Sequence, residues 1–316
     1  MGALLIPIFT GAAIVMVGVA LALSQFCLVR SVLGIRRGDL SPARCLVGLS
    51  LLIAISLIVI AHWRGGETMP TYPPRLSVLF GGLLFGIAAR ANGGCFVGTL
   101  NRLCKGDWRR LFTVGGWILG YALLRLPPIS AHHQSPVEVG LVLGGLTGLL
   151  WLLNRRARRL QQRFAPNPAE PKLNGRLAWA LMLSTGFLVG LLHHSGLPWD
   201  PSSLAKALGH RLTGTPFPLV NAYALWVPVG IALVHGLRRD WKWIGLQPKD
   251  AALLLWGMLM ALGSVWGMGA NDSYLFRYLP LGSLHAAIGL VAMAAGILLG
   301  DWLFSQPIGW PSQRRK

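Results

Sequence analysis

The sequence predicts an all-α polytopic membrane protein with about nine transmembrane helices and additional re-entrant broken-helix segments. Of the 316 residues, 53% are hydrophobic and only 12% are charged, whereas about a quarter of the residues in an ordinary soluble domain are charged. The apolar residues are gathered in runs that approach the roughly 20 residues needed to cross a bilayer. Polar stretches rich in Gly follow several of these runs, as expected where a membrane helix is interrupted.

Nine apolar runs are the expected spans. They cover residues 3–23, 43–62, 76–90, 110–126, 137–153, 176–194, 217–236, 251–268 and 283–304. Residues 1–153 form a first membrane half of five spans, residues 154–175 a basic, Pro-containing cytoplasmic linker, and residues 176–316 a second half of four spans. Because the first half has an odd number of spans, the second half has the opposite orientation, which predicts an inverted pseudo-repeat of the kind found in transporters.

The formal net charge of +19 is distributed in a way that orients a membrane protein. Most of the 29 Lys and Arg residues lie in alternate loops, within residues 30–44, 102–110, 155–176, 238–249 and 314–316. The positive-inside rule assigns these loops to the cytoplasm, with the N-terminus outside and the C-terminus inside. Basic chains also bind nucleic acids, but orientation already explains charges confined to short loops, so no nucleic-acid partner is expected.

Four polar interruptions follow the first, third, sixth and eighth runs. The most unusual is Ala91 to Trp108, which reads ANGGCFVGTLNRLCKGDW. Its glycines around Cys95 permit close approach of the backbone to a ligand. Non-helical backbone at membrane depth persists only when it is buried in protein or lines a wet cavity. We therefore expect this stretch, and the similar one around Cys27, to be a broken helix that dips into the membrane.

The cysteines and histidines predict neither a disulfide framework nor a metal or cofactor site. Cys27, Cys45, Cys95 and Cys104 include no C-x-x-C pair and no histidine at zinc-like spacing. Cys45 and Cys104 are expected to be packing thiols, while for Cys95 an incidental buried thiol and a ligand contact are both open. Neighbouring histidines, as in the pairs 132–133 and 193–194, point in different directions on a helix and form no chelate, so interfacial histidines are the favoured interpretation.

Two first-half segments carry a resemblance to a known family. GVALALSQFCLVRSVLGIRRGD, from Gly18, and FGGLLFGIAARANGGCFVGTLNRLCKGDWRRL, from Phe80, resemble the signature regions of the sulphur-transport (YeeE/YedE) family of thiosulfate-uptake membrane proteins. The later segment GMGANDSYLFRYLPLGSLH, from Gly267, is similar to that family's second-half loop. The resemblance implies that Cys27 and Cys95 contact the transported anion in a central constriction. The cysteine of the later loop is replaced here by Ala270.

Further contacts follow from anion chemistry. Broken-helix N-termini offer backbone amide donors to an anion, and the candidates for this role are Gly94, Phe96 and Val97. Asn271 and Ser273 could replace the donor that is lost at Ala270. Arg277 lies in a sparsely basic outer loop, where it could steer anions inward, and His285 could take up a proton or donate to the anion. Asn92, beside the Cys95 loop, is expected to cap a broken helix.

These observations predict a multi-pass protein of a bacterial inner membrane that imports a sulphur-containing anion, with thiosulfate as the expected substrate. Its surroundings are the lipid bilayer, and the resemblance implies a cytoplasmic sulphur-carrier protein as a partner. One alternative is a transporter of another sulphur or selenium species, which Ala270 suggests. Another is a membrane-embedded thiol redox enzyme, but the sequence has no metal motif and no paired acid and base residues, so no enzyme activity is expected.

Overall fold

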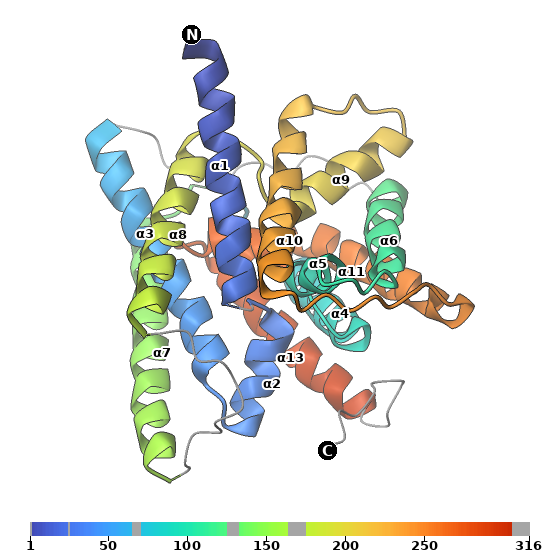
Figure 1. The fold of residues 1–316 in the computed structure, drawn as a ribbon. Coiled ribbons are helices and arrows are strands. Elements are labelled where there is room, and N and C mark those ends of the chain that lie inside the picture. Colours follow the sequence, from blue (N-terminus) through green and yellow to red (C-terminus); the bar gives the residue numbers. More distant parts are fainter. Residues whose placement is uncertain (1, 25, 65–70, 125–132, 164–174, 305–316) are drawn as a thin grey trace.

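A computed structural model describes residues 2–24, 26–64, 71–124, 133–163 and 175–304. These residues form helices joined by loops, which confirms the predicted all-α membrane class (Figure 1). Each of the nine predicted apolar runs contains a helix. These helices are α1 (Gly2–Leu23), α3 (Ser41–Arg64), α4 (Leu76–Asn92), α6 (Arg110–Leu123), α7 (Pro136–Arg163), α8 (Gly175–His194), α10 (Trp226–Arg238), α11 (Ala252–Gly267) and α13 (Leu284–Leu303).

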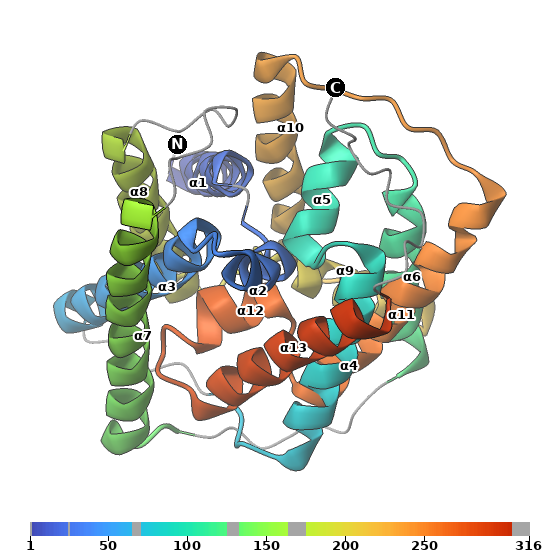
Figure 2. The same ribbon diagram turned by 90° about the horizontal axis from the view of Figure 1, so that it is seen from below.

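Short helices occupy the four polar interruptions. They are α2 (Leu28–Arg37), α5 (Phe96–Cys104), α9 (Pro201–Leu212) and α12 (Asn271–Ser273), the last continued by the π-helical turn η3 (Tyr274–Tyr278). Two 3-10 turns, η1 (Leu219–Leu225) and η2 (Pro248–Ala251), precede α10 and α11. Viewed along the molecule, the short helices lie inside the arrangement of long ones (Figure 2). The interruptions therefore bring four helix starts into the interior of the bundle.

Seven stretches of the described residues are long and apolar enough to cross a membrane. Two of these stretches run through interruptions and join α1 with α2 and α4 with α5. Helix α6 is not among them, and the part of α8 that qualifies as apolar, Ala180–His194, is counted as a shorter helix. The count of nine spans stays a prediction. The start of α1 and the end of α13 lie at opposite ends of the molecule (Figure 1), as an odd number of crossings requires.

Glycines set the spacing of the longest helix contacts. Helix α11 packs against both α6 and α4, and α13 packs against the other side of α4. A Cβ added to Gly86 of α4 would lie 2.2 Å from the Met293 carbonyl oxygen of α13, and one added to Gly116 of α6 would lie 2.1 Å from that of Leu254 in α11. Lipid tails are as apolar as Leu side chains, so membrane helices associate largely through such close packing.

Helix α7 stands at the periphery of the bundle. It contacts α3 and α13, while apolar side chains such as Val137 (70% exposed) and Leu141 (67% exposed) face outward. This exposure suits a helix that faces lipid. The helix continues to Arg163 and so runs into the segment predicted as a linker. The prolines of that segment, at positions 166, 168 and 171, lie outside the described residues.

Candidate functional site

Cys27 and Cys95 occupy the same position in two helix breaks. Cys27 is the N-cap of α2 and Cys95 the N-cap of α5, both with extended backbone. Neither thiol caps its helix with a hydrogen bond. The first N–H groups of each helix have no intrahelical acceptor and give the helix start a partial positive charge. Each thiol therefore sits beside backbone donors that favour an anion or a thiolate.

The two thiols meet in the interior, although 68 positions separate them in the sequence. Their Sγ atoms are 3.6 Å apart, and Cys95 is fully buried whereas Cys27 is partly accessible. Gly98, in the first turn of α5, packs against this pair, because a Cβ there would lie 2.7 Å from the Cys27 sulphur. The sequence indicated both cysteines separately but gave no sign that they touch.

The residues predicted to offer backbone amide donors lie next to the Cys27–Cys95 pair and are tightly packed. Gly94 lies in the turn before Cys95, and Phe96 and Val97 form the first turn of α5. The Phe96 side chain is fully buried and its ring stacks on Trp117, with the ring centroids 4.0 Å apart. The side chains of Phe96 and Val97 thus pack the site, and only their backbone N–H groups are suited to contact an anion.

The break between α11 and α12 repeats the backbone of the α4–α5 break. In both, the long helix ends at a residue with positive φ, the next residue donates its N–H to a carbonyl five positions earlier at 2.9 Å, and the third residue is the N-cap of the short helix. The equivalent residues are Gly93 and Met268, Gly94 and Gly269, and Cys95 and Ala270. This local repeat places Ala270 where a third thiol would stand.

Met268 adopts a conformation that favours glycine, with φ of 58°. A left-handed backbone conformation costs a residue with a Cβ about 1–2 kcal/mol. Met268→Gly and Met268→Ala both remove the long side chain, but only the Ala variant keeps a Cβ. We therefore expect the Gly variant to be more stable than the Ala variant by about 1 kcal/mol, as measured by thermal unfolding in detergent. Equal stability, or the usual preference for Ala, would contradict a strained turn. Gly140→Ala on α7, where an added Cβ meets nothing within 4 Å, is the control.

The α8–α9 break carries a carboxylate at the N-cap instead of a thiol. Asp200 accepts hydrogen bonds from the Ser203 backbone N–H at 3.0 Å and from the Ser202 hydroxyl at 2.8 Å. Asp272, at the start of α12, is fully buried and accepts a hydrogen bond from the Ser202 backbone N–H at 3.0 Å. The two short helices of the second half are therefore joined through Ser202.

A cavity of about 410 Å³ opens beside this junction. Its wall combines cationic and imidazole groups with hydroxyl groups and the turn at Ala270. The lining residues are Tyr72, Tyr121, Leu124, Ser202, Ser203, Lys206, His210, Thr215, Ser264, Val265, Met268, Gly269, Ala270, Ser273, Arg277 and Tyr278. Basic side chains around one space are suited to a small oxyanion.

The predicted second-half contacts divide between the cavity and the core. Ser273 and Arg277 line the cavity, and the Arg277 guanidinium lies 5.5 Å from the centre of the Tyr278 ring. Asn271 is 1% exposed and His285 is fully buried, and neither lines the cavity. The Nδ1 atom of His285 contacts the Ser283 hydroxyl. The cavity is also lined by Lys206, which was not among the predicted contacts.

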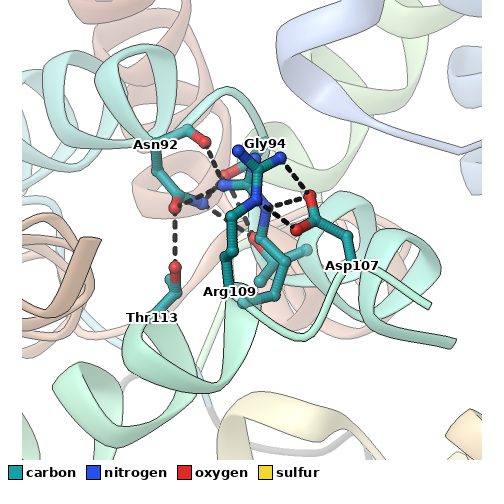
Figure 3. Close-up of polar contacts among 7 residues, drawn as sticks. Asn92, Gly94, Asp107, Arg109 and Thr113 are labelled. Atoms are coloured by element: carbon teal, nitrogen blue, oxygen red, sulfur yellow. Dashed lines mark hydrogen bonds and ion pairs between the residues drawn. The ribbon is translucent and has the colours of Figure 1, made fainter. Parts of the chain in front are cut away.

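A buried polar cluster fixes the loop that carries Cys95 (Figure 3). Asn92 donates to the Gly94 carbonyl at 2.8 Å and accepts from Thr113 at 2.7 Å. Arg110 donates to the Asn92 backbone and side-chain oxygens at 2.5 and 3.1 Å, and to Asp107 at 3.1 Å. The expectation that Asn92 is a helix cap was therefore incomplete, because its side chain connects the loop to α6. The sequence offered no signal for Arg110 beyond one charge in a basic loop.

Asp107 is the anionic member of this cluster. Burial alone would raise the pKa of its carboxyl, but hydrogen bonds and charges from Arg109 and Arg110 outweigh burial and hold the pKa below its ordinary value. Arg109 donates to Asp107 at 2.7 Å and is more exposed than Arg110. The carboxylate is therefore charged at neutral pH and pairs with both arginines.

Ion pairs also anchor the far ends of the two cysteine helices. At the end of α2, Arg36 lies 2.5 Å from Asp301 of α13, which also pairs with Arg90 of α4 at 2.8 Å. Beyond α5, Lys105 lies 3.0 Å from Asp240. These ion pairs connect the C-terminal ends of α2 and α5 to neighbouring parts of the bundle.

The histidine pairs do not assemble a metal centre in the described part of the chain. His193 is buried and its Nε2 contacts the Phe276 carbonyl, while His133 is exposed and position 132 lies outside the described residues. Within those residues, no three His, Cys, Asp or Glu side chains are grouped closely enough to hold a metal ion.

Comparison with models of known protein families gives a match. A family model described as sulphur transport matches residues 17–194, more than half of the chain. The match includes both cysteine breaks and the cluster around Asn92. No curated protein matches the chain.

Proposed function

The chain belongs to the sulphur-transport family, and from this premise we propose that it imports a sulphur-containing anion, thiosulfate in the first instance, past the paired thiols of Cys27 and Cys95. Family membership points to a transporter of sulphur compounds rather than to an enzyme. The observation that carries the proposal is the 3.6 Å contact between the two sulphur atoms at the starts of two helices.

Thiols suit such a passage for a physical reason. A thiol is a weak hydrogen-bond donor with a soft, polarizable sulphur atom, so it can hold the terminal sulphur of thiosulfate without binding it strongly. Conduction requires sites that the ion leaves again readily. Arginines at the same place would hold a dianion too firmly, and in this protein the buried Arg110 is directed to Asn92 and Asp107 instead.

The cavity beside Ala270 supplies the outer stage of the proposed route. Lys206 and Arg277 attract the anion, while the Ser273 hydroxyl, which lines the same cavity, donates to the Ala270 carbonyl at 3.1 Å. Helix α12 packs against α5, so this region adjoins the helix that carries Cys95. Ion entry would thus proceed from cationic side chains to soft thiols, with Ala270 leaving the outer stage without a thiol of its own.

Orientation and partners complete the proposal. The protein lies in a bacterial inner membrane with its N-terminus outside, and its two halves are inverted relative to one another, as the charge pattern and the repeated α4–α5 and α11–α12 turns suggest. On the cytoplasmic side the anion passes to a sulphur-carrier protein, the partner implied by the family resemblance. The orientation is tested by introducing cysteines in the last turns of α7 (155–163) or in the 213–216 loop and labelling them from one side of the membrane.

Growth on thiosulfate as sole sulphur source, in a bacterial strain without other thiosulfate uptake, tests the function. We expect the intact chain to support growth and Cys27→Ala or Cys95→Ala to lower uptake about tenfold or more, since loss of one buried hydrogen-bonding contact costs about 1–3 kcal/mol. Cys45→Ala and Cys104→Ala are matched controls that should retain uptake. Full uptake by the double variant Cys27→Ala/Cys95→Ala would exclude the thiol contacts, and failure of the intact chain would exclude thiosulfate.

Ala270 favours a second candidate substrate, a larger sulphur or selenium anion. Its small side chain leaves space in the cavity wall where a thiol would otherwise project. Competition by selenosulfate against labelled thiosulfate distinguishes the two. We expect selenosulfate to inhibit thiosulfate uptake by the intact chain more effectively than uptake by the Ala270→Cys variant.

A further inference from the structure

The thiol pair has the geometry of a reactive dithiol as well as of an ion contact. The Cys27 and Cys95 sulphur atoms lie 3.6 Å apart, so no other atom fits between them. Cys27 is partly accessible, whereas Cys95 is buried behind it. One thiol can therefore meet a reagent in the passage while the other waits at contact distance.

Local structure favours reaction at these thiols. Thiolates, rather than thiols, attack sulphur–sulphur bonds, and a helix N-terminus promotes the thiolate. Both cysteines hold that position, and neither is committed to a capping hydrogen bond. A disulfide needs its sulphur atoms about 2.05 Å apart, so the present pair must approach by about 1.5 Å.

We propose that Cys27 and Cys95 form a reversible disulfide on reaction with polythionates, the anions in which two thiosulfate units or their fragments are joined through sulphur–sulphur bonds. The choice of oxidant rests on the proposed function, because a passage for thiosulfate also admits its oxidised, equally charged dimer. The thiol chemistry rests only on the geometry of the pair.

The reaction with tetrathionate balances without a further reagent. The Cys27 thiolate attacks an inner sulphur of tetrathionate, the central sulphur–sulphur bond breaks, and one thiosulfate leaves. The Cys95 thiolate then attacks the Cys27 sulphur of the mixed species and expels the second thiosulfate. Two thiols and one tetrathionate thus give one disulfide, two thiosulfates and two protons: the cysteines are oxidised by two electrons and tetrathionate is reduced by two. A dithiol reductant reverses the change.

The bond would alter the passage directly. It would link the α1–α2 break to the α4–α5 break and remove both thiols as donors. Because the bond would join the N-terminal ends of α2 and α5 covalently, these two helix starts could no longer separate. The oxidised protein is therefore a closed form.

Intact-protein mass spectrometry after alkylation of free thiols tests the proposal without relying on transport. The protein, purified in lipid nanodiscs and carrying Cys45→Ala and Cys104→Ala, is treated with tetrathionate. We expect no free thiol to remain available for alkylation. A digest should then contain a peptide pair joined through Cys27 and Cys95, and dithiothreitol should restore both free thiols. Adding Cys95→Ser should instead leave one thiosulfate adduct on Cys27. Peptide mapping of the unsubstituted chain repeats the measurement if the double replacement does not fold.

The outcomes separate this proposal from the proposed function. Two unreacted thiols, or stable adducts on both cysteines without a disulfide, would overturn the redox site whether or not the protein carries thiosulfate. In proteoliposomes, we expect oxidation to lower thiosulfate uptake about tenfold or more, a change equivalent to about 1.4 kcal/mol, and the reductant to restore it. Unchanged uptake by disulfide-bonded protein would overturn the closed form. Reduced protein that carries no thiosulfate would count against the function, while the mass measurement would still decide the disulfide.

Discussion

Arg110→Met is expected to destabilise the protein by about 3–5 kcal/mol, the range measured when one partner of a buried ion pair is removed. Arg110 is 6% exposed and donates to Asp107 and to two oxygens of Asn92. Without the guanidinium, the Asn92 backbone oxygen loses this donor, the buried Asp107 carboxylate keeps only Arg109, and the turn before Cys95 is tied to α6 by Thr113 alone. Thermal unfolding and the yield of monodisperse protein in detergent measure the loss, and thiosulfate uptake should fall with them.

Arg109→Met is the matched control for this prediction. Arg109 is adjacent and binds the same carboxylate, but its side chain is 23% exposed and its hydrogen bonds go to Asp107 rather than to Asn92. Partly exposed ion pairs contribute about 0–1 kcal/mol, so this variant should remain close to the parent. An equal loss of stability in both variants would mean that the protein needs the positive charge beside Asp107 and not the contacts of Arg110 with Asn92.

Gly86→Val is expected to disrupt the bundle by forcing α4 away from α13. Even the first added carbon would lie 2.2 Å from the Met293 carbonyl oxygen and 2.8 Å from the Ile297 backbone nitrogen. Backbone atoms cannot move aside as a flexible side chain can, and overpacking of a well-packed core typically costs about 1–3 kcal/mol and in some cases more. We expect the destabilisation by Gly86→Val to lie at the upper end of this range or beyond it, as measured by thermal unfolding.

Gly148→Val tests whether this loss comes from packing rather than from the residue change. Gly148 lies in α7, where an added Cβ meets no atom within 4 Å. Both variants place a β-branched residue in a membrane helix, so their intrinsic helix propensities change equally. Similar losses in the two would contradict the role assigned to the α4–α13 contact.

Much of the fold followed from composition and periodicity. The nine apolar runs all contain helices, because a long apolar run in a membrane has few ways to satisfy its backbone groups other than as a helix. The short helices within the interruptions were harder to delimit. Segments such as Leu28–Arg37 and Pro201–Leu212 mix polar and apolar residues, so their helical form depends on burial among neighbours. The π-helical turn at Tyr274–Tyr278 likewise had no local signal.

The candidate site divides in the same way. Residue chemistry and family resemblance identified Cys27, Cys95, Ser273 and Arg277, because each is a polar or reactive side chain in a polar interruption between apolar runs. The contact between the thiols, the hydrogen bonds of Arg110 and the position of Lys206 depend on which helices become neighbours. His285 shows the opposite case: its chemistry suggested an anion contact, but its ring is buried among the Tyr72, Tyr274 and Tyr278 rings at centroid distances of 5.0–5.6 Å.

The fit of Gly98 against the Cys27 sulphur has an electrical consequence. The two sulphurs are in contact, and a Cβ added to Gly98 would lie 2.7 Å from the Cys27 sulphur. In the proposed route, this close contact also acts as a seal against leakage of protons driven by the voltage across the membrane. Gly98→Ala should perturb this seal, and a proton leak in proteoliposomes under an imposed voltage would report it.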